Sequence, residues 1–170
     1  MPGGDRPSAR ARLNLAVLGE DLGDSLRLWL EEYGYDPGGI RGFRVAVLRD
    51  HDLVWNYHSC RGRGGAANLE PREGGEVWGA LIELDEGLLR ALDHKENSPA
   101  AYWRGKDRLR VETADGEGAE AWVYLARPNS GSRRDVWPTR GYRDLLVRSA
   151  LSLGLPREYV EKLKSIPTRD

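Results

Sequence analysis

The sequence predicts an α+β fold in which about six or seven β-strands form a closed or nearly closed barrel with helices outside it. Apolar residues alternate or run together in several short segments, as expected for strands with buried faces. Helical periodicity falls between these segments at irregular intervals, which disfavours a doubly wound sheet. Because open sheets leave edges exposed, this many antiparallel strands in one small domain favour a barrel.

The predicted strands share apolar alternation and are bounded by glycine or acidic residues. They are residues 13–17, 43–47, 54–58 and 76–84, and a hairpin within 107–127 that turns at Asp115–Gly116. A turn at residues 49–52 separates the second strand from the third. Residues 59–75 are rich in glycine and arginine, and we expect a long loop there.

Four segments have the 3.6-residue period of helices. The first gathers its apolar residues on one face: Leu26, Trp29, Leu30 and Tyr33. Asp24 or Ser25 could cap its start, and Gly34 could end it.

The second helix is predicted over residues 85–96, with Asp85 as its cap. It turns three leucines inward: Leu88, Leu89 and Leu92. The third ends at Gly154, and Pro156 opens a fourth that continues to Leu163.

Length and composition restrict the class of protein. At 170 residues the chain is most simply one domain, which we expect over residues 13–170 after a disordered lead of residues 1–12. The 26 basic and 27 acidic residues give a net charge of −1, which argues against nucleic acid as a partner. No apolar run approaches the roughly 20 residues of a membrane span, and the first residues lack the apolar stretch of a secretory signal. We therefore expect no membrane partner and a cytoplasmic location.

Three local patterns have ordinary structural explanations. Cys60 lies two residues after His58 on the same face of a strand, but no third group orients a thiol nucleophile. Residues 61–65 resemble one copy of an RNA-binding arginine–glycine tract, and a surface turn explains them better. A single cysteine and three scattered histidines predict neither a disulfide framework nor a metal site.

Two features support stronger chemical hypotheses. Gly19 stands between a strand and a helix, where backbone N–H groups can bind an anion or where glycine merely permits the bend. Glu96 ends the second helix, where the negative end of the helix dipole disfavours an ionised carboxylate. The carboxylate therefore binds a proton more strongly, which suits a general base near neutral pH. A solvated helix end is the alternative. Three tyrosines could offer hydroxyl groups to a polar ligand or pack in the core: Tyr102, Tyr124 and Tyr142.

The segment GGAANLEPREGGEVWGALIELDEGLLRALDHKE resembles the central signature of the gamma-glutamylcyclotransferases. In that family a Gly-x-Ala-Asn-Ile/Leu-x-Pro loop precedes VWG, an apolar strand and LDxxE. The tail GLPREYVEKLKSIPTRD is similar to the family's GLPxEYxxKL ending. The resemblance covers roughly residues 13–166 and implies a small mixed barrel flanked by helices.

This resemblance also implies an activity: an acyltransferase or lyase type of enzyme without cofactor or metal, which converts a gamma-glutamyl amide to 5-oxoproline and a free amine, as in glutathione metabolism. It implies that Glu96 is the general base and acid, and that the three tyrosines help bind the glutamyl group. The family's Tyr-Gly-Ser-Asn-Leu loop, which holds that group through its backbone N–H groups, corresponds here to Leu18, Gly19, Glu20, Asp21 and Leu22.

This loop departs from the family pattern, because Glu20 and Asp21 replace the serine and the asparagine. Two carboxylates repel the α-carboxylate of a glutamyl substrate if they face it. The alternative hypothesis is a non-catalytic module that binds a small ligand or peptide on the same fold. It would be favoured if the side chain of Arg27 or of another residue fills the cavity next to Glu96 that Tyr102, Tyr124 and the Gly19 N–H groups are expected to line. The substrate amine stays open among glutathione, γ-glutamyl amino acids, γ-glutamyl-lysine and acylated natural products, and a cationic amine portion is one hypothesis. A monomer and a homodimer are both compatible with the sequence.

Overall fold

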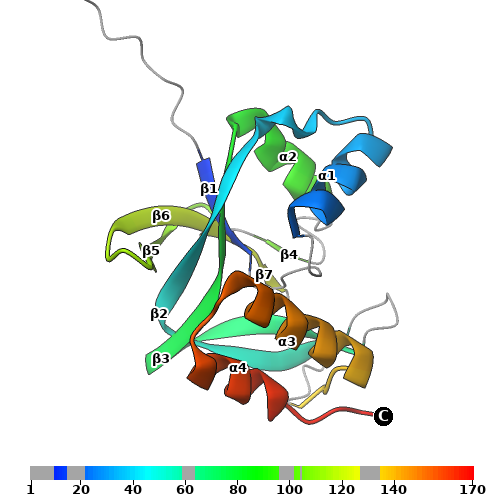
Figure 1. Cartoon of the computed structure of the whole chain (residues 1–170), viewed down its shortest axis with the longest axis vertical. Coiled ribbons are helices and arrows are strands. Elements are labelled where there is room, and N and C mark those ends of the chain that lie inside the picture. Colours follow the sequence, from blue (N-terminus) through cyan, green and yellow to red (C-terminus); the bar gives the residue numbers. More distant parts are fainter. Residues whose placement is uncertain (1–9, 15–21, 59–63, 96–101, 104, 127–134) are drawn as a thin grey trace, which may run out of the picture.

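Two long antiparallel strands organise the fold (Figure 1). The computed structural model describes residues 10–14, 22–58, 64–95, 102–103, 105–126 and 135–170. The strands are β1 (Arg10–Asn14), β2 (Ile40–His58), β3 (Gly65–Leu84), β4 (Tyr102–Trp103), β5 (Leu109–Thr113), β6 (Gly118–Val123) and β7 (Leu125–Ala126). The helices are α1 (Leu22–Glu32), the short 3₁₀ helix η1 (Pro37–Gly39), α2 (Glu86–Lys95), α3 (Arg140–Leu153) and α4 (Arg157–Lys164).

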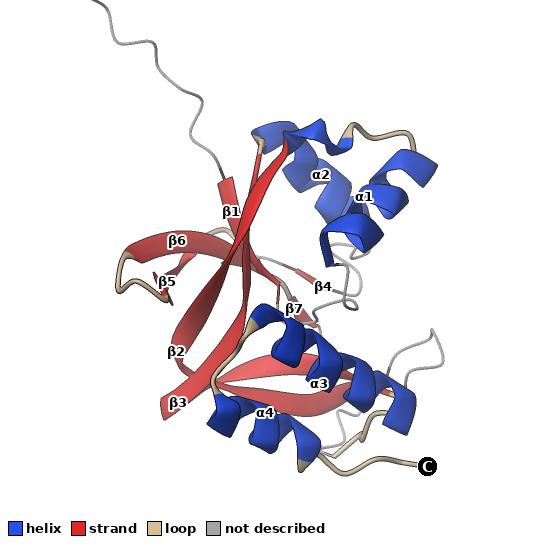
Figure 2. Ribbon diagram, in the orientation of Figure 1, coloured by secondary structure: helices blue, strands red, loops and turns tan. Residues whose placement is uncertain are grey.

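Five strands pair in the cyclic order β1-β3-β2-β5-β6. All pairs are antiparallel except β1 with β6, which runs parallel and closes the ring. The closed part is short: β2 and β5 pair at Ala46↔Thr113 and Val47↔Glu112, while β2 and β3 continue well beyond it. The predicted small mixed barrel flanked by helices is confirmed, in the loose sense that only part of the sheet closes (Figure 2).

The prediction of a turn at residues 49–52 was wrong, because β2 runs through them as one strand of 19 residues. Asp50 takes the left-handed conformation, with φ of 56°, and the register shifts around it between Arg49 and His51. Its carboxylate accepts a hydrogen bond of 3.0 Å from the Gly74 backbone. The turn-forming residues therefore make a β-bulge rather than a reversal of the chain.

The predicted loop over residues 59–75 was also wrong from Gly65 onward, because β3 begins there and runs for 20 residues. Residues 65–71 pair with the last part of β2, for example Val54↔Asn68 and His51↔Pro71. The backbone at Gly75 passes so close to β2 that an added Cβ would lie 2.4 Å from the His51 carbonyl oxygen. Glycine in this segment allows close strand approach as well as chain reversal.

The start of the sheet lies three residues before the predicted domain start at residue 13, because Arg10, Ala11 and Arg12 pair with β3 from Leu84 to Ile82. Helix α1 likewise begins at Leu22, so Asp24 and Ser25 lie inside its first turn and do not precede it as caps. Predictions of the later helix ends are confirmed. Gly154, with φ of 70°, follows α3, and Pro156 directly precedes α4.

Two apolar clusters hold the helices onto the strands. Leu26 and Leu30 of α1 pack with Leu88 and Leu92 of α2 against one end of the barrel. The predicted inward face of α2 is confirmed, and that of α1 is confirmed except at Tyr33, which is exposed. A second cluster joins α3 and α4 to the far half of the β2–β3 pair, as Figure 1 shows at the bottom of the molecule. Within the described residues, no helix is both long and apolar enough to cross a membrane.

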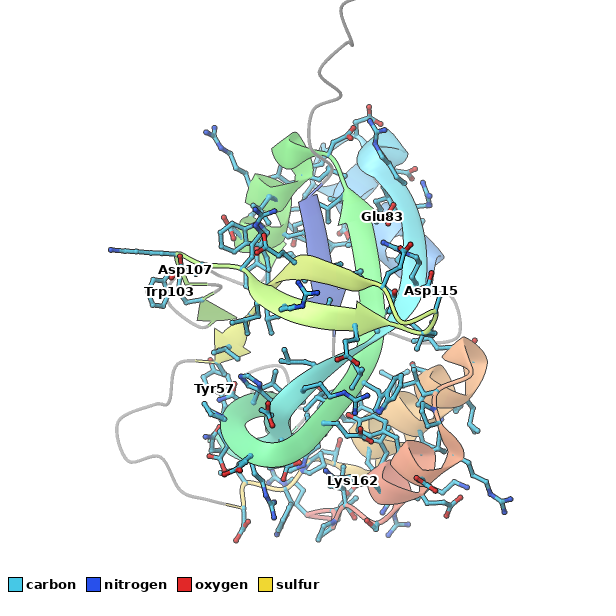
Figure 3. The ribbon with its side chains drawn as sticks, turned by 90° about the vertical axis from the view of Figure 1, so that its left-hand side faces the viewer. Tyr57, Glu83, Trp103, Asp107, Asp115 and Lys162 are labelled. Carbon is cyan, nitrogen blue, oxygen red and sulfur yellow. The ribbon has the colours of Figure 1, made fainter. Side chains whose placement is uncertain are left out.

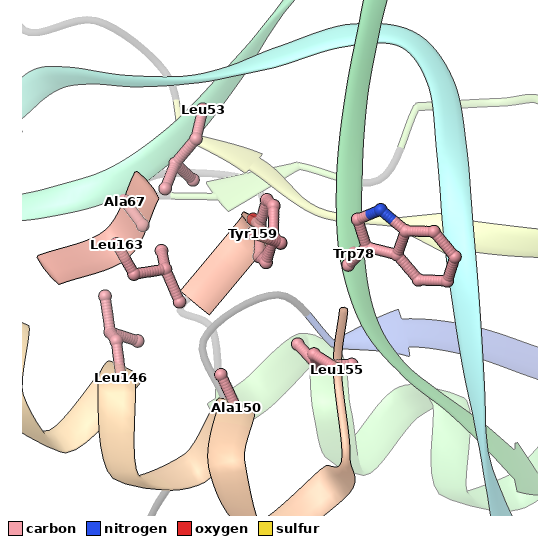
Figure 4. Close-up of a pocket in the computed structure, with 8 residues that line it drawn as sticks. All are labelled: Leu53, Ala67, Trp78, Leu146, Ala150, Leu155, Tyr159 and Leu163. Carbon is pink, nitrogen blue, oxygen red and sulfur yellow. The ribbon is translucent and has the colours of Figure 1, made fainter. Parts of the chain in front are cut away.

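An ion-pair cluster fastens α4 to the same pair of strands. Lys162 of α4, which is labelled in Figure 3, donates to the Asp52 carboxylate at 2.6 Å. Arg72 donates to the same carboxylate at 2.7 Å. A cavity of about 10 Å³ lies under α3 and α4, lined by apolar side chains and by Trp78 and Tyr159 (Figure 4). This space is at the lower limit for one water molecule, so it is a packing gap rather than a ligand site.

Candidate functional site

Tyr124 is the predicted site residue that the structure describes most fully. It lies between β6 and β7, its side chain is buried, and its hydroxyl donates a 2.5 Å hydrogen bond to the Asp93 carboxylate. Asp93 is in the last turn of α2, three residues before Glu96 in the sequence. A short phenol–carboxylate bond of this kind fixes the ring and joins the barrel to the C-terminal end of α2.

The backbone of Tyr102 lies beside the segment that carries Tyr124. Tyr102 is the first residue of β4 and pairs with Ala126 of β7, while Trp103 pairs with Leu125. The strand pair thus brings the main chains of two predicted substrate-binding residues together, although they are far apart in the sequence. The Tyr102 side chain lies outside the described part of the structure.

Tyr142 lies in a different cluster from Tyr124. It is buried in the first turn of α3 and meets Trp55 of β2 edge to face, with 6.1 Å between ring centroids. Leu146 completes the buried part of this cluster. The Thr139 hydroxyl caps α3 by accepting from the Tyr142 backbone at 3.3 Å. Because Tyr142 packs on Trp55, it has a structural role that does not depend on any contact with a ligand.

The remaining predicted site residues fall largely outside the described residues. These are Glu96 and the loop residues Leu18, Gly19, Glu20 and Asp21, and Cys60 of the thiol hypothesis. Leu22 is described as the first residue of α1, where backbone N–H groups have no partner within the helix. The roles of these residues stay predictions.

Arg27, the side chain proposed as a possible cavity filler, is directed to the loop after α1. Its guanidinium donates to the Pro37 carbonyl oxygen at 3.3 Å. This contact gives Arg27 a structural explanation at η1. The cavity that a side chain would have to fill includes Glu96 and the Gly19 loop, which lie outside the described residues.

His94, in the last turn of α2, packs against a cluster of three aromatic rings. Its Nδ1 lies 3.0 Å from the Tyr35 hydroxyl, and its ring meets Trp29, Tyr33 and Tyr35 edge-on. His51 lies elsewhere, with Nδ1 at 2.9 Å from the Arg49 carbonyl oxygen. Among the described residues, no three histidine, cysteine or acidic side chains gather as metal ligands.

Sequence reasoning missed Asp93. The residue is part of the LDHKE segment, three positions before Glu96. Residues three apart on a helix lie on the same face, so this spacing could have indicated that Asp93 is near the site. The hydrogen bond from Tyr124 was not predictable, because it joins residues 31 positions apart through the tertiary fold.

Comparisons with known proteins agree with this fold. The sequence profile of the AIG2-like family matches residues 76–163, which include β3 from Glu76, α2 and most of α4. Human gamma-glutamylcyclotransferase is 28% identical over 134 residues, which are 75% of this chain and 68% of that protein. The mouse gamma-glutamylcyclotransferase is 29% identical over 126 residues, 72% of this chain and 64% of that protein.

Solved structures show the same fold. A gamma-glutamyl cyclotransferase superimposes with a TM-score of 0.78 and 24% identity over 96% of this chain and 90% of its own. A human protein described as uncharacterised gives a TM-score of 0.74 and 24% identity over 95% of this chain and 90% of its own. Since the family profile matches more than half of the sequence, the chain belongs to the AIG2-like, gamma-glutamylcyclotransferase-like family.

Proposed function

We propose that this protein is a cyclotransferase that converts a gamma-glutamyl amide to 5-oxoproline and a free amine. The observation that supports this proposal most directly is the buried Tyr124, whose hydroxyl is held by Asp93 at the end of α2. The family membership and the relatives named gamma-glutamylcyclotransferase favour this function over a non-catalytic binding module.

The reaction needs little covalent help from a protein. The α-amine of the glutamyl group attacks its own γ-carbonyl carbon, a C–N bond forms in a five-membered lactam, and the bond to the leaving amine breaks. Because nucleophile and electrophile are in one molecule, holding the chain folded supplies a large part of the rate, with effective molarities on the order of 10⁵ M or more. No external oxidant, reductant or cofactor enters this balance.

Proton transfer is the remaining requirement. The substrate ammonium must lose a proton before it attacks, and the leaving amine must gain one. We assign both transfers to Glu96, which follows α2 directly in the sequence. We assign binding of the glutamyl group to the backbone around Gly19 and to Tyr102, Tyr124 and Tyr142. We further propose that the enzyme acts in the cytoplasm as a monomer or a homodimer.

A panel of γ-glutamyl amines tests this function. Glutathione, a γ-glutamyl amino acid and γ-glutamyl-lysine are incubated with the enzyme, and 5-oxoproline is measured by mass spectrometry. We expect release from at least one member, at least a 10³-fold loss of kcat in Glu96→Gln, and a raised KM in Tyr124→Phe, which loses the hydroxyl that Asp93 holds.

The α-linked isomer of the best substrate is the matched control, because it carries no γ-amide to cleave. It should give no 5-oxoproline above background. No release from any γ-glutamyl amine at high enzyme concentration would reject the proposed activity. Full activity in Glu96→Gln would reject only the assignment of Glu96 as general base and acid, and the proposed activity would stand.

A further inference from the structure

The carboxamide of Asn68, the fourth residue of β3, is buried and makes three hydrogen bonds. Its Oδ1 accepts from the Ala126 backbone N–H at 2.8 Å, and its Nδ2 donates to the Ala126 carbonyl oxygen at 3.3 Å. The same nitrogen donates to the Asn56 side-chain oxygen at 2.9 Å. These three bonds use the carbonyl and both amide hydrogens, and a reversed amide would set donor against donor at Ala126.

The Asn68 side chain therefore takes the place of a strand residue. In an antiparallel sheet, a hydrogen-bonded pair of residues exchanges two N–H···O bonds between their backbones. Here Ala126 exchanges both bonds with a side-chain amide that has the same donor and acceptor groups as a peptide. Strand β7 has two residues, so this anchor supplies much of what holds it against β3.

We propose that Asn68 is a positioning residue for the candidate site: it sets the place of the Tyr124 hydroxyl and of the Tyr102 main chain through Ala126. Tyr124 lies two residues before Ala126, and its ring is held separately by Asp93. Tyr102 pairs with Ala126 from β4. This inference rests on the proposed function, since Tyr102 and Tyr124 are the residues assigned to glutamyl binding.

The test compares Asn68→Ala with Asn56→Ala, because the second variant removes a bond to Nδ2 but keeps both bonds to Ala126. Amide hydrogen exchange at Ala126 and the amide chemical shifts of Tyr102 and Tyr124 are read by NMR. In Asn68→Ala we expect at least about tenfold faster exchange at Ala126 and shifts at both tyrosines. With the best γ-glutamyl substrate, KM should rise about tenfold while kcat changes less than threefold. Asn56→Ala should leave all of these values near wild type.

Asn68→Ser serves where Asn68→Ala does not fold, and urea unfolding reports the global stability of each variant. Unchanged Ala126 exchange in a folded Asn68 variant would overturn the inference. So would fast exchange with an unchanged KM, or equal effects in Asn56→Ala. If the wild-type enzyme releases no 5-oxoproline, the proposed function fails, and the NMR comparison still decides whether Asn68 positions the two tyrosine segments.

Discussion

Asp52 shows how a single carboxylate can join two distant parts of the chain. Its side chain is 14% exposed and accepts hydrogen bonds from Lys162 and Arg72. Burial alone would raise the pKa of Asp52. The opposing contributions are larger and hold the pKa below its ordinary 3.8: the hydrogen bonds from Lys162 and Arg72, the charge of Lys162, and the hydrogen bond from the Leu53 backbone N–H. The carboxyl is thus more acidic in the folded chain. Its contribution to stability is present above the unfolded pKa and is lost as the pH falls through the lower, folded value.

Replacing Lys162 tests this contact at the residue scale. We expect Lys162→Gln to lower the free energy of unfolding at pH 7 by about 1–2 kcal/mol. The difference from wild type should begin to shrink below about pH 4, where Asp52 of the unfolded chain becomes protonated, and should vanish once the pH falls through the lower pKa of the folded chain. Urea unfolding at a series of pH values measures it.

Lys164→Gln is the matched control on the same helix. Its Nζ lies 3.0 Å from Glu161, but both side chains are about half exposed or more, so we expect a change of less than about 0.5 kcal/mol. A Lys162→Gln deficit that stayed constant down to the acid limit of the folded state would contradict the assignment to Asp52.

At the same scale, the sequence singled out Tyr124 but not the two residues that hold it in place. Asn68 belongs to the quoted family motif but had no role assigned, Asp93 was not singled out, and each acquires its role from a partner that only the fold supplies. Gly19 and Glu96 stood out from their places at a strand–helix turn and a helix end, and the family resemblance gave them specific roles. Both, with the rest of the loop from Leu18 to Asp21, lie outside the described residues. Their roles remain predictions.

At the scale of elements, local signals predicted the helices and misread the long strands. Gly154 ends α3 through its own left-handed conformation, so the local sequence is sufficient to predict where this helix ends. The turn-forming residues near Asp50 and Gly74 would end strands in most contexts. Here they face each other across the β2–β3 pair, and the Gly74 N–H bonds Asp50. The two turn-like segments therefore form one β-bulge between paired strands. This could not be predicted, because the sequence of one segment does not show which segment it pairs with.

The two glycines Gly65 and Gly141 allow a matched test of close packing. An added Cβ at Gly65 would lie 1.5 Å from the Val136 carbonyl oxygen, whereas one at Gly141 in α3 meets nothing within 4 Å. We expect Gly65→Ala to lower the free energy of unfolding by about 3 kcal/mol or more, because backbone must move to admit the methyl group. Gly141→Ala should leave it unchanged or raise it by up to about 1 kcal/mol.

Thermal and urea unfolding of both variants measure these effects. Equal stability of the two variants would mean that the segment around Val136 yields to the new methyl group without cost. The Gly65 N–H bond to the Trp137 carbonyl oxygen, at 3.0 Å, argues that this segment is held in place.

At the scale of the whole molecule, one pair of strands supports two helical layers. Helices α1 and α2 cover one end of the barrel, and α3 and α4 cover the far half of the β2–β3 pair. Tyr159 and Leu163 of α4 are buried in the second layer, and burial raises the pKa of the Tyr159 phenol. Because the same strands run through both layers, loss of one should weaken the other.

Leu163→Ala tests this coupling. The leucine is 5% exposed, and its removal should cost about 2–5 kcal/mol of unfolding free energy in a single cooperative transition. The control, Leu151→Ala, removes a leucine of α3 that is 58% exposed and should cost about 0.5 kcal/mol or less. Two separate transitions in Leu163→Ala, followed by tryptophan fluorescence and circular dichroism, would show that the layers unfold independently.

The parallel contact between β1 and β6 has a consequence for biosynthesis. Ala11 pairs with Ala121, so the ring cannot close until roughly 110 further residues have been made. At ribosomal rates of about 5–20 residues per second, β1 waits on the order of ten seconds for this neighbour. Contacts of such wide sequence separation also slow spontaneous folding. During that interval the edge of β1 that β6 will cover has no strand beside it, and a nascent chain in this state is the one for which chaperones would matter most.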